Sequence, residues 1–218
     1  MSGRGAGIPF VVAAPSGTGK TTVCRRVVER DAHVEFSISH TTRPSRPGER
    51  DGVDYHFVTP AEFERLVAKG AFLEWAVYHG HRYGTSREAL DAPLARGRDV
   101  LLEIEIQGAR QVRARREDAR LIFLLPPALD VLERRLRSRQ TESEQDLEGR
   151  LRLARLEIAQ ADGCFDYAVV NDDLERCVAS VLEILAAERA GAAAELRGRF
   201  APAPALAALR GAAAAPVR

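Results

Sequence analysis

The sequence is poor in cysteine and lysine, and neither sign of charge is in clear excess. Its three cysteines share no CxxC spacing, which argues against a disulfide framework or a zinc ribbon and predicts the reducing cytoplasm as its location. The 32 Lys and Arg residues are balanced by 31 Asp and Glu residues, so the formal net charge of the 218-residue chain is +1. Such a chain lacks the overall positive field by which nucleic-acid and membrane-surface binders gather polyanions.

Long apolar runs are also missing. No uninterrupted run approaches the roughly 20 residues needed to span a bilayer. The apolar segment nearest the N-terminus, residues 8–14, contains Pro9 and is preceded by a single arginine, so it predicts a strand and not a signal peptide. With 45% hydrophobic residues, the chain can bury a sizeable core, and its length suits one or at most two soluble domains.

Short apolar runs alternate with helical patterns along most of the chain. Strands are predicted at residues 8–13, 99–106, 121–125 and 167–170. Helical spacing follows each of them, at residues 19–31, at 107–116, from Leu129 onward, and after the capping pair Asp172 and Asp173. This alternation predicts an α/β fold with parallel strands joined by right-handed helical crossovers.

Three segments depart from that alternation. Residues 41–97 open with a polar loop and then show short aromatic-rich runs around a helix-like stretch at 60–69, which indicates an inserted substrate subdomain. Residues 134–153 are dense in Arg and Glu, as a solvated mobile segment would be. From about residue 186 the composition becomes Ala, Arg, Gly and Pro, which predicts a helix end followed by a disordered tail.

One motif lies between the first strand and the first helix. It fits the phosphate-binding loop GxxxxGK[ST], except that alanine replaces the first glycine. The residues are, in order, Ala14, Pro15, Ser16, Gly17, Thr18, Gly19, Lys20 and Thr21. The glycines allow backbone N–H groups to face phosphate oxygens, the lysine reaches the β and γ phosphates, and the threonine can bind Mg²⁺. The motif predicts binding of a nucleoside triphosphate.

The lysine of this loop strengthens that prediction. Lys20 and Lys69 are the two lysines among 32 basic residues, and the chain uses arginine everywhere else. A compact ammonium suits the space between phosphates better than a broad planar guanidinium. A lysine at this position is therefore not explained by composition.

A second phosphate site is indicated in the insertion. Arg43 and Arg46 lie three residues apart on a loop with hydroxyl groups, and guanidinium groups pair bidentately with phosphate oxygens. Tyr55 and Tyr83 can donate hydrogen bonds to the same phosphate. From these residues alone, a solvated basic loop with core-packing tyrosines is an equal alternative.

Several stretches together resemble the guanylate kinase family, whose members transfer the γ-phosphoryl group of ATP to GMP. These stretches are residues 14–21, 37–43, 46–49, 52–55, 72–76, 83–85, 107–108 and 170–173. They occur in the family's order and spacing and span most of residues 8–185. The alanine at position 14 is a variant that bacterial members of the family also carry.

The resemblance implies a P-loop nucleoside monophosphate kinase fold, an α/β fold with a five-stranded parallel core sheet, an inserted GMP-binding subdomain and a mobile lid. The kinase-like domain is expected at residues 1–190. Its core is expected at 8–36, 98–133 and 163–190, the GMP-binding subdomain at 37–97 and the lid at 134–162, with a tail at 191–218.

The resemblance also implies the acceptor site. In the family pattern, one group of residues holds the GMP phosphate, namely Ser39, Arg43, Arg46, Tyr55 and Tyr83. Glu74 and Thr85 are expected to read guanine. The chemistry agrees, because a carboxylate accepts from guanine N1–H and the N2 amine while a hydroxyl can serve O6. Adenine would leave these polar groups unpaired.

The strand before Gln107 carries a departure from the family. The family's Leu-Asp-Ile-Asp reads Leu-Glu-Ile-Glu here, with Glu103 and Glu105 on the same face of the strand. Glu103 is the predicted guanine contact, and Glu105 is predicted to hold Mg²⁺ with Thr21. Because each glutamate reaches one methylene further than the family's aspartate, the reverse assignment is an alternative.

The remaining expected catalytic groups are cations beside Lys20 and Arg43. Arg135, Arg139 and Arg150 match the family's lid arginines, which would stabilise the charge of the transferring phosphoryl group. The glycines that flank the middle lid arginine in the family are replaced by Ser138 and Gln140. Asn171 matches a position that touches the adenine of ATP, with a helix cap as its alternative. The expected ligands are Mg²⁺, ATP, and GMP or dGMP, with no nucleic acid and no membrane partner; the oligomeric state is undetermined.

The sequence argues against two other classes of protein. Ribose 1,5-bisphosphate phosphokinases resemble guanylate kinases in the P-loop half but need no guanine reader, so Glu74 and Thr85 argue against them. Guanylate-kinase-like interaction modules bind phosphopeptides and lack a working phosphate loop, so Lys20 and Thr21 argue against that class.

Overall fold

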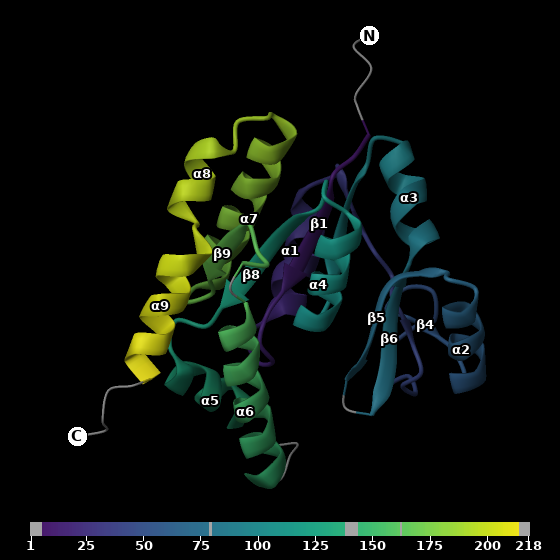
Figure 1. Cartoon of the computed structure of the whole chain (residues 1–218), viewed down its shortest axis with the longest axis horizontal. Helices are drawn as coiled ribbons and strands as arrows, with labels where there is room; N and C mark the ends of the chain where they lie inside the picture. The colour runs from purple at the N-terminus through teal and green to yellow at the C-terminus, as the bar shows by residue number, and fades with distance from the viewer. Residues whose placement is uncertain (1–5, 79, 138–143, 162, 214–218) are drawn as a thin grey trace. The chain divides into compact units, whose positions relative to one another are not determined.

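The computed structural model describes residues 6–78, 80–137, 144–161 and 163–213 (Figure 1). Five strands form one sheet in the order β2-β7-β1-β8-β9. They are β1 (Pro9–Ala13), β2 (Val34–Phe36), β7 (Asp99–Glu103), β8 (Arg120–Leu125) and β9 (Tyr167–Val170). The pairings of β2 with β7 and of β8 with β9 are parallel, as the alternation of strands and helices predicted.

The chain divides into two compact units. Unit 1 comprises residues 1–11 and 32–119, and unit 2 comprises residues 12–31 and 120–218. This two-way division differs from the expected core, inserted subdomain and lid, which therefore remain a prediction.

Unit 1 contains a second, four-stranded sheet in the order β4-β3-β6-β5. Its strands are β3 (His40–Thr41), β4 (His56–Phe57), β5 (Phe72–Tyr78) and β6 (His81–Ser86). The helices of this unit are α2 (Pro60–Ala68), α3 (Arg87–Ala95) and α4 (Ile106–Arg115). β5 and β6 are antiparallel, and the pair of residues nearest their connection is Tyr78 with His81.

Local sequence explains these helix starts. Thr59 caps α2 by accepting from the N–H of Glu62, with Pro60 at the first helical position, and Ser86 caps α3 by accepting from Ala89. The aromatic residues of the insertion pack against one another, since the Phe63 and Phe72 rings stack at 4.6 Å. The aromatic-rich insertion thus builds its own small core.

Unit 2 is built around β8 and β9 and is mainly helical. Its helices are α1 (Lys20–Arg30), α5 (Leu129–Arg137), α6 (Glu144–Gln160), α7 (Leu174–Arg189), α8 (Ala194–Arg199) and α9 (Pro202–Ala213). The β8 side chains from Leu121 to Leu125 are at most 1% exposed, which explains why this strand reads as an unbroken apolar run. Asp173 caps α7 by accepting from the N–H of Arg176.

The segment expected to be solvated and mobile forms regular helices where it is described. Leu147 and Ala154 of α6 are buried against Leu132 and Leu136 of α5, with Leu151 packed beside them. These apolar residues are spread thinly among charges, but helical spacing brings them to one face. The prediction of a continuous solvated segment was therefore wrong for residues 144–153.

The segment expected to be a disordered tail is helical up to Ala213. Leu196, Leu206 and Leu209 are at most 7% exposed, so α8 and α9 bury an apolar face. Alanine, which dominates the tail, has the highest helix propensity of all residues. The expectation of disorder was wrong for residues 194–213. It rested on the overall composition and did not consider that three spaced leucines could be buried.

A buried carboxylate ties α8 to the rest of unit 2. Glu188, at the end of α7, accepts hydrogen bonds from the Tyr167 hydroxyl, from Arg120 Nε at 2.8 Å and from Arg197 Nη2 at 2.9 Å. Burial raises the pKa of Tyr167 to about 12, and the hydrogen bond to Glu188 acts in the same direction. This cluster joins β8, β9, α7 and α8.

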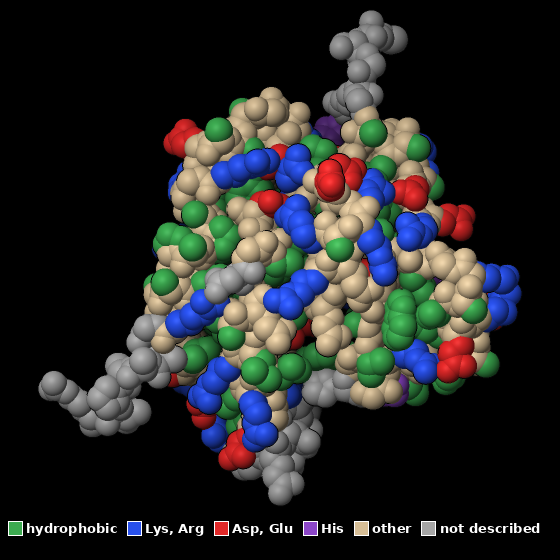
Figure 2. All heavy atoms as spheres, viewed as in Figure 1, with side chains coloured by type: hydrophobic (Ala, Val, Ile, Leu, Met, Phe, Trp, Pro, Cys, Tyr) green, Lys and Arg blue, Asp and Glu red, His purple; other side chains and the backbone are tan. Residues whose placement is uncertain are grey.

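The face drawn in Figure 2 carries side chains of both signs of charge. On the face drawn in Figure 2, basic side chains are scattered among acidic and uncharged ones and do not gather in one patch. Within the described residues, no helix combines the length and the apolar character that a membrane crossing requires. All three cysteines are buried as thiols, and burial raises the pKa of the Cys177 thiol to about 12.

Candidate functional site

The predicted phosphate loop lies between β1 and α1, as its motif requires. Gly17 and Gly19 have φ values of 87° and 95°, in the left-handed region that favours glycine, and Gly19 is the N-cap of α1. A Cβ on Gly17 would lie 2.8 Å from Leu136 Cδ2, so α5 packs directly on the loop. Lys20 and Thr21 follow in the first turn of α1, where helix N–H groups face an anion.

Asn171 holds this loop from the end of β9. Its Nδ2 donates to the Thr18 carbonyl at 2.7 Å, and the side chain lies so close to Gly19 that a Cβ there would be 2.9 Å from Nδ2. The helix cap is Asp173, which removes the alternative role considered for Asn171. Asn171 is 6% exposed and braces the phosphate loop.

Two of the predicted lid arginines also touch the loop. Arg150 of α6 donates to Ser16 Oγ at 2.6 Å. Arg135 of α5 donates to the Asn171 carbonyl at 3.0 Å and to the Thr18 carbonyl at 3.5 Å. The third, Arg139, lies outside the described residues. Unit 2 therefore gathers the phosphate loop, Asn171 and two guanidinium groups in one place.

Unit 1 gathers part of the predicted acceptor-phosphate group. The guanidinium carbon of Arg43 lies 5.5 Å from the Tyr55 ring centroid, and the Tyr55 and Tyr83 rings are 6.0 Å apart. Arg43 donates to Glu49 Oε1 at 2.8 Å, and this hydrogen bond raises the pKa of Arg43, with Tyr83 contributing in the same direction. The loop thus holds Arg43 as a fixed cation beside two phenol rings.

Glu49 organises this loop and was not singled out from the sequence. Its Oε2 accepts from the backbone N–H of Arg46 at 2.7 Å, while its Oε1 accepts from Arg43, and the latter bond lowers the pKa of Glu49. The Arg46 side chain is exposed. Ser39 is partly buried, and its backbone carbonyl accepts from the N–H of His56 at 2.9 Å. A glutamate three residues after a loop arginine is the signal that sequence reasoning overlooked.

The predicted base-reading pair is joined directly. Glu74 on β5 faces Thr85 on β6 in the antiparallel register. Glu74 Oε1 accepts from the Thr85 hydroxyl at 2.7 Å and from the Thr85 backbone N–H at 3.0 Å. Glu74 is 3% exposed and Thr85 is fully buried. The structure therefore fixes a carboxylate at a buried position by two hydrogen bonds from one neighbour.

The two glutamates before Ile106 take different positions. The strand predicted at residues 99–106 ends at Glu103, and Glu105 is the N-cap residue of α4, so the prediction that both glutamates share one strand face was wrong. The chain leaves the extended conformation before Glu105 because the helix begins at Ile106. Both are partly buried. In the described part of the chain, no group of three or more His, Cys, Asp or Glu side chains forms a metal site.

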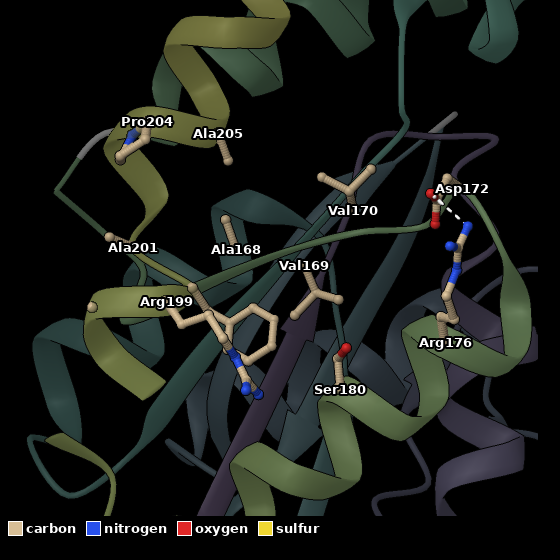
Figure 3. Close-up of a pocket in the computed structure, with 12 residues that line it drawn as sticks. Ala168, Val169, Val170, Asp172, Arg176, Ser180, Arg199, Ala201, Pro204 and Ala205 are labelled. Atoms are coloured by element: carbon tan, nitrogen blue, oxygen red, sulfur yellow. Dashed lines mark hydrogen bonds and ion pairs between the residues drawn. The ribbon is translucent and has the colours of Figure 1, made fainter. Parts of the chain in front are cut away.

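A surface pocket of about 390 Å³ lies in another part of unit 2 (Figure 3). It is lined by β9, by α7 and by the turn between α8 and α9, and it includes the ion pair of Arg176 with Asp172 at 2.9 Å. Its lining, as far as the described residues show, contains none of the predicted site residues.

The comparisons with known proteins agree with one another. The family model for guanylate kinase matches residues 6–188. A guanylate kinase of Thermus thermophilus is 54% identical over 180 residues, which cover 83% of this chain and 81% of the relative. The guanylate kinase of Sphingopyxis alaskensis is 48% identical over 184 residues, which cover 84% and 83%.

A solved structure of a guanylate kinase also matches this chain. The crystal structure of guanylate kinase from Anaplasma phagocytophilum has a TM-score of 0.71 with this chain at 34% identity, and the match covers 85% of this chain and 88% of that one. Helices α8 and α9 lie beyond residue 188, where the family model ends. By sequence and by fold, the chain belongs to the guanylate kinase family.

Proposed function

We propose that the protein transfers the γ-phosphoryl group of ATP to GMP, and to dGMP, giving ADP and GDP or dGDP. This reaction belongs to purine nucleotide metabolism and to the recycling of GMP. The observation that carries the proposal is the buried carboxylate of Glu74, oriented by two hydrogen bonds from Thr85, in a chain that also has a phosphate loop. The reducing cytoplasm remains the predicted location.

We infer that unit 1 binds the acceptor nucleotide. Glu74 and Glu103 would accept from guanine N1–H and the N2 amine. The Thr85 hydroxyl, which donates its one proton to Glu74 Oε1, would serve O6 by exchanging that hydrogen bond for one to the base. The acceptor phosphate is assigned to five residues that share cationic or hydroxyl groups, namely Ser39, Arg43, Arg46, Tyr55 and Tyr83. Arg43 supports this assignment because Glu49 and the phenol rings hold its side chain before a phosphate arrives.

We assign the ATP phosphates to the loop of unit 2. Backbone N–H groups of the loop from Ala14 to Gly19, except Pro15, which has none, and the Lys20 ammonium would bind the β and γ phosphates. Arg135, Arg139 and Arg150 would stabilise the charge on the transferring phosphoryl group. The contacts of Arg135 and Arg150 with loop atoms support their place in this site. Asn171 would keep the loop in shape and is the proposed neighbour of adenine.

Mg²⁺ is the ion proposed to accompany ATP. The Thr21 hydroxyl, in the first turn of α1, and the Glu105 carboxylate are the proposed ligands, because each is a hard oxygen donor of the kind that this ion prefers. Mg²⁺ binds mainly through substrate phosphates and water, so one or two protein oxygens are sufficient. When bound, the ion would neutralise phosphate charge.

The transfer requires no strong protein base. A phosphate oxygen of GMP is already anionic, and it forms a bond to the γ-phosphorus while the bond from that phosphorus to the bridging oxygen of ADP breaks. No proton has to leave the nucleophile. Positioning by arginines, with stabilisation of the transferring charge, therefore supplies the catalysis.

A coupled assay of ADP release tests the proposal. Mg·ATP is supplied with GMP, dGMP, AMP, CMP, UMP or ribose 1,5-bisphosphate, with Lys20→Ala as the blank. Turnover confined to GMP and dGMP is expected. Preference for ribose 1,5-bisphosphate would assign the chain to a different kinase, and the absence of turnover with every acceptor would overturn the enzymatic proposal.

A further inference from the structure

The strand that carries Glu74 is an edge strand of its sheet. Among the described residues, β5 pairs with β6 on one side in the order β4-β3-β6-β5, and no described strand holds the backbone groups on its other side. Helix α4 packs on β5 within unit 1 (Figure 1). The contacts that α4 side chains make with the β5 backbone therefore help to hold Glu74 in place.

Gln111 of α4 supplies the hydrogen bonds that a neighbouring strand would otherwise provide. Its Nε2 donates to the Trp75 carbonyl at 2.7 Å, and its Oε1 accepts from the Trp75 backbone N–H at 3.3 Å. One side-chain amide thus satisfies both backbone groups of the residue that follows Glu74. This pairing fixes the backbone on the C-terminal side of Glu74.

Arg115 makes the corresponding contact on the N-terminal side. Its guanidinium donates to the carbonyl of Leu73, the residue before Glu74, and lies 3.4 Å from Gln111 Oε1. Together, Gln111 and Arg115 hold the peptide groups on both sides of the carboxylate residue. A glutamate held in this way loses little further backbone freedom when a ligand binds.

Gly108 brings the same helix against the carboxylate itself. A Cβ at position 108 would overlap the Glu74 carboxyl group, so the helix approaches Glu74 through a residue without a side chain. Gly108, Gln111 and Arg115 are spaced i, i+3 and i+7, which places them on one face of α4. One helix face therefore contacts Glu74 and both of its chain neighbours.

We propose that Gln111 and Arg115 are positioning residues that set the selectivity of this enzyme for guanine over other bases. The inference rests on the proposed function, since it assumes that Glu74 reads the base. Discrimination by a hydrogen-bonding site depends on donors and acceptors meeting at correct distances. If the edge of β5 shifts, the carboxylate no longer meets N1–H and the N2 amine together, and the penalty against other bases falls.

The test compares kcat/KM for GMP and for AMP in Gln111→Leu, which removes both hydrogen bonds to Trp75 at similar volume. Because a displacement of about 1 Å can cost up to about 100-fold in rate, we expect kcat/KM for GMP to fall about 10-fold. The KM for GMP should rise, and the KM for ATP should stay within about twofold of the wild-type value. The ratio of kcat/KM for GMP to kcat/KM for AMP, called the GMP-to-AMP ratio below, should fall about 10-fold.

Two further variants keep the test decisive if Gln111→Leu folds poorly. Gln111→Glu retains an acceptor for the Trp75 N–H but loses the donor to its carbonyl, and should give an intermediate ratio. Arg115→Met should lower the ratio as well. The matched control is Arg113→Met on the same helix, because Arg113 lies two residues from both Gln111 and Arg115, on another face of α4, where its guanidinium donates to the Ala119 carbonyl. Its ratio should equal that of the wild type.

A double mutant separates positioning from simple destabilisation. In Glu74→Gln the carboxylate is already lost, so adding Gln111→Leu should leave the GMP-to-AMP ratio unchanged, whereas an independent effect would add. An unchanged ratio and GMP KM in folded Gln111→Leu would overturn the inference. If Glu74→Gln itself keeps wild-type selectivity, the assignment of Glu74 in the proposed function fails instead.

Discussion

The two units of the chain hold their functional charges in different ways. In unit 1, the predicted acceptor residues are fixed by side-chain pairs, such as Arg43 with Glu49 and Glu74 with Thr85. In unit 2, Arg135 and Arg150 contact backbone and hydroxyl oxygens of the phosphate loop. Side-chain pairs give selectivity for the shape of one ligand, whereas a loop of backbone groups serves any polyphosphate. Acceptor choice and donor binding should therefore respond to different substitutions.

The buried carboxylates of the two units sharpen this contrast. Glu74 Oε1 accepts from a hydroxyl and a backbone N–H of Thr85, whereas Glu188 accepts from the Tyr167 hydroxyl and from Arg120 and Arg197. A carboxylate joined to two guanidinium groups is suited to holding helices together. We therefore expect substitution of Glu188 to affect stability and substitution of Glu74 to affect acceptor choice.

The largest effect is expected from Lys20→Ala in unit 2. Loss of one charge-stabilising group at a phosphoryl site costs about 1000-fold in kcat. GMP should still bind as to the wild type, because Lys20 is proposed to bind the phosphates of ATP and not those of GMP. The coupled assay measures kcat, and titration calorimetry measures GMP binding. Equal loss of GMP affinity would contradict the separation of the two functions.

Glu74→Gln in unit 1 should produce the opposite pattern. The amide turns one acceptor into a donor that faces guanine N–H groups, so kcat/KM for GMP should fall about 100-fold while the KM for ATP hardly changes. Glu64→Gln is the control, since the Glu64 side chain is 64% exposed and pairs at the surface with Arg82. If Glu74→Gln retained the full preference for GMP over AMP, the proposed role of Glu74 would be refuted.

Glu49→Gln tests whether the loop cation is held in advance. The neutral amide no longer holds Arg43 as an ion pair, so the KM for GMP should rise roughly 10-fold with little change in kcat. The hydrogen bond from Arg43 lowers the pKa of Glu49, so this carboxylate supports the loop at neutral pH and loses that effect as the pH falls through its depressed value. An initial-rate analysis with varied GMP distinguishes KM from kcat.

Glu188→Gln should weaken folding and leave acceptor choice alone. Replacing the carboxylate by an amide of the same shape weakens its charged hydrogen bonds and should cost roughly 2 kcal/mol in unfolding free energy, measured by urea denaturation. Burial alone would raise the pKa of Glu188, but hydrogen bonds from Tyr167, Arg120 and Arg197 outweigh it and lower that pKa overall. The stabilisation is therefore complete above the unfolded pKa and is lost as the pH falls through the folded one. A changed GMP-to-AMP ratio in Glu188→Gln would contradict the expectation that Glu188 acts on stability and Glu74 on acceptor choice.

The smallest effect is expected from Arg176→Ala. Its ion pair with Asp172 lies at the surface, with side-chain exposures of 74% and 47%, so the unfolding free energy should change by less than about 0.5 kcal/mol. Activity should be that of the wild type, because the pocket that Arg176 lines is not the proposed site. Loss of turnover in this variant would show that the pocket takes part in the reaction.

The sequence predicted the parts of the fold that have one strong local signal. The strand at residues 167–170 was correct at both ends, and the phosphate loop lies between a strand and a helix as its motif requires. Helices α6, α8 and α9 were missed because their buried leucines are spaced among charged residues or alanines. Tertiary packing, and not local composition, decides such segments.

The site residues that lie in sequence motifs were predictable. The resemblance assigned Glu74 and Thr85 to the same base, and the register of β5 with β6 brings the two residues together. The contacts of Gln111 and Arg115 were not predictable, because they end on backbone carbonyl and N–H groups, which nearly every residue possesses. Asn171 as a brace of the phosphate loop was missed for the same reason.

The most direct test of the account is a pair of separate calorimetric titrations, one of GMP and one of Mg·ATP, into Lys20→Ala and Glu74→Gln. The account predicts that Lys20→Ala loses affinity for ATP and keeps GMP affinity, while Glu74→Gln loses affinity for GMP and keeps ATP affinity. Loss of both ligands by either folded variant would contradict the assignment of acceptor recognition to unit 1 and of ATP phosphate binding to unit 2.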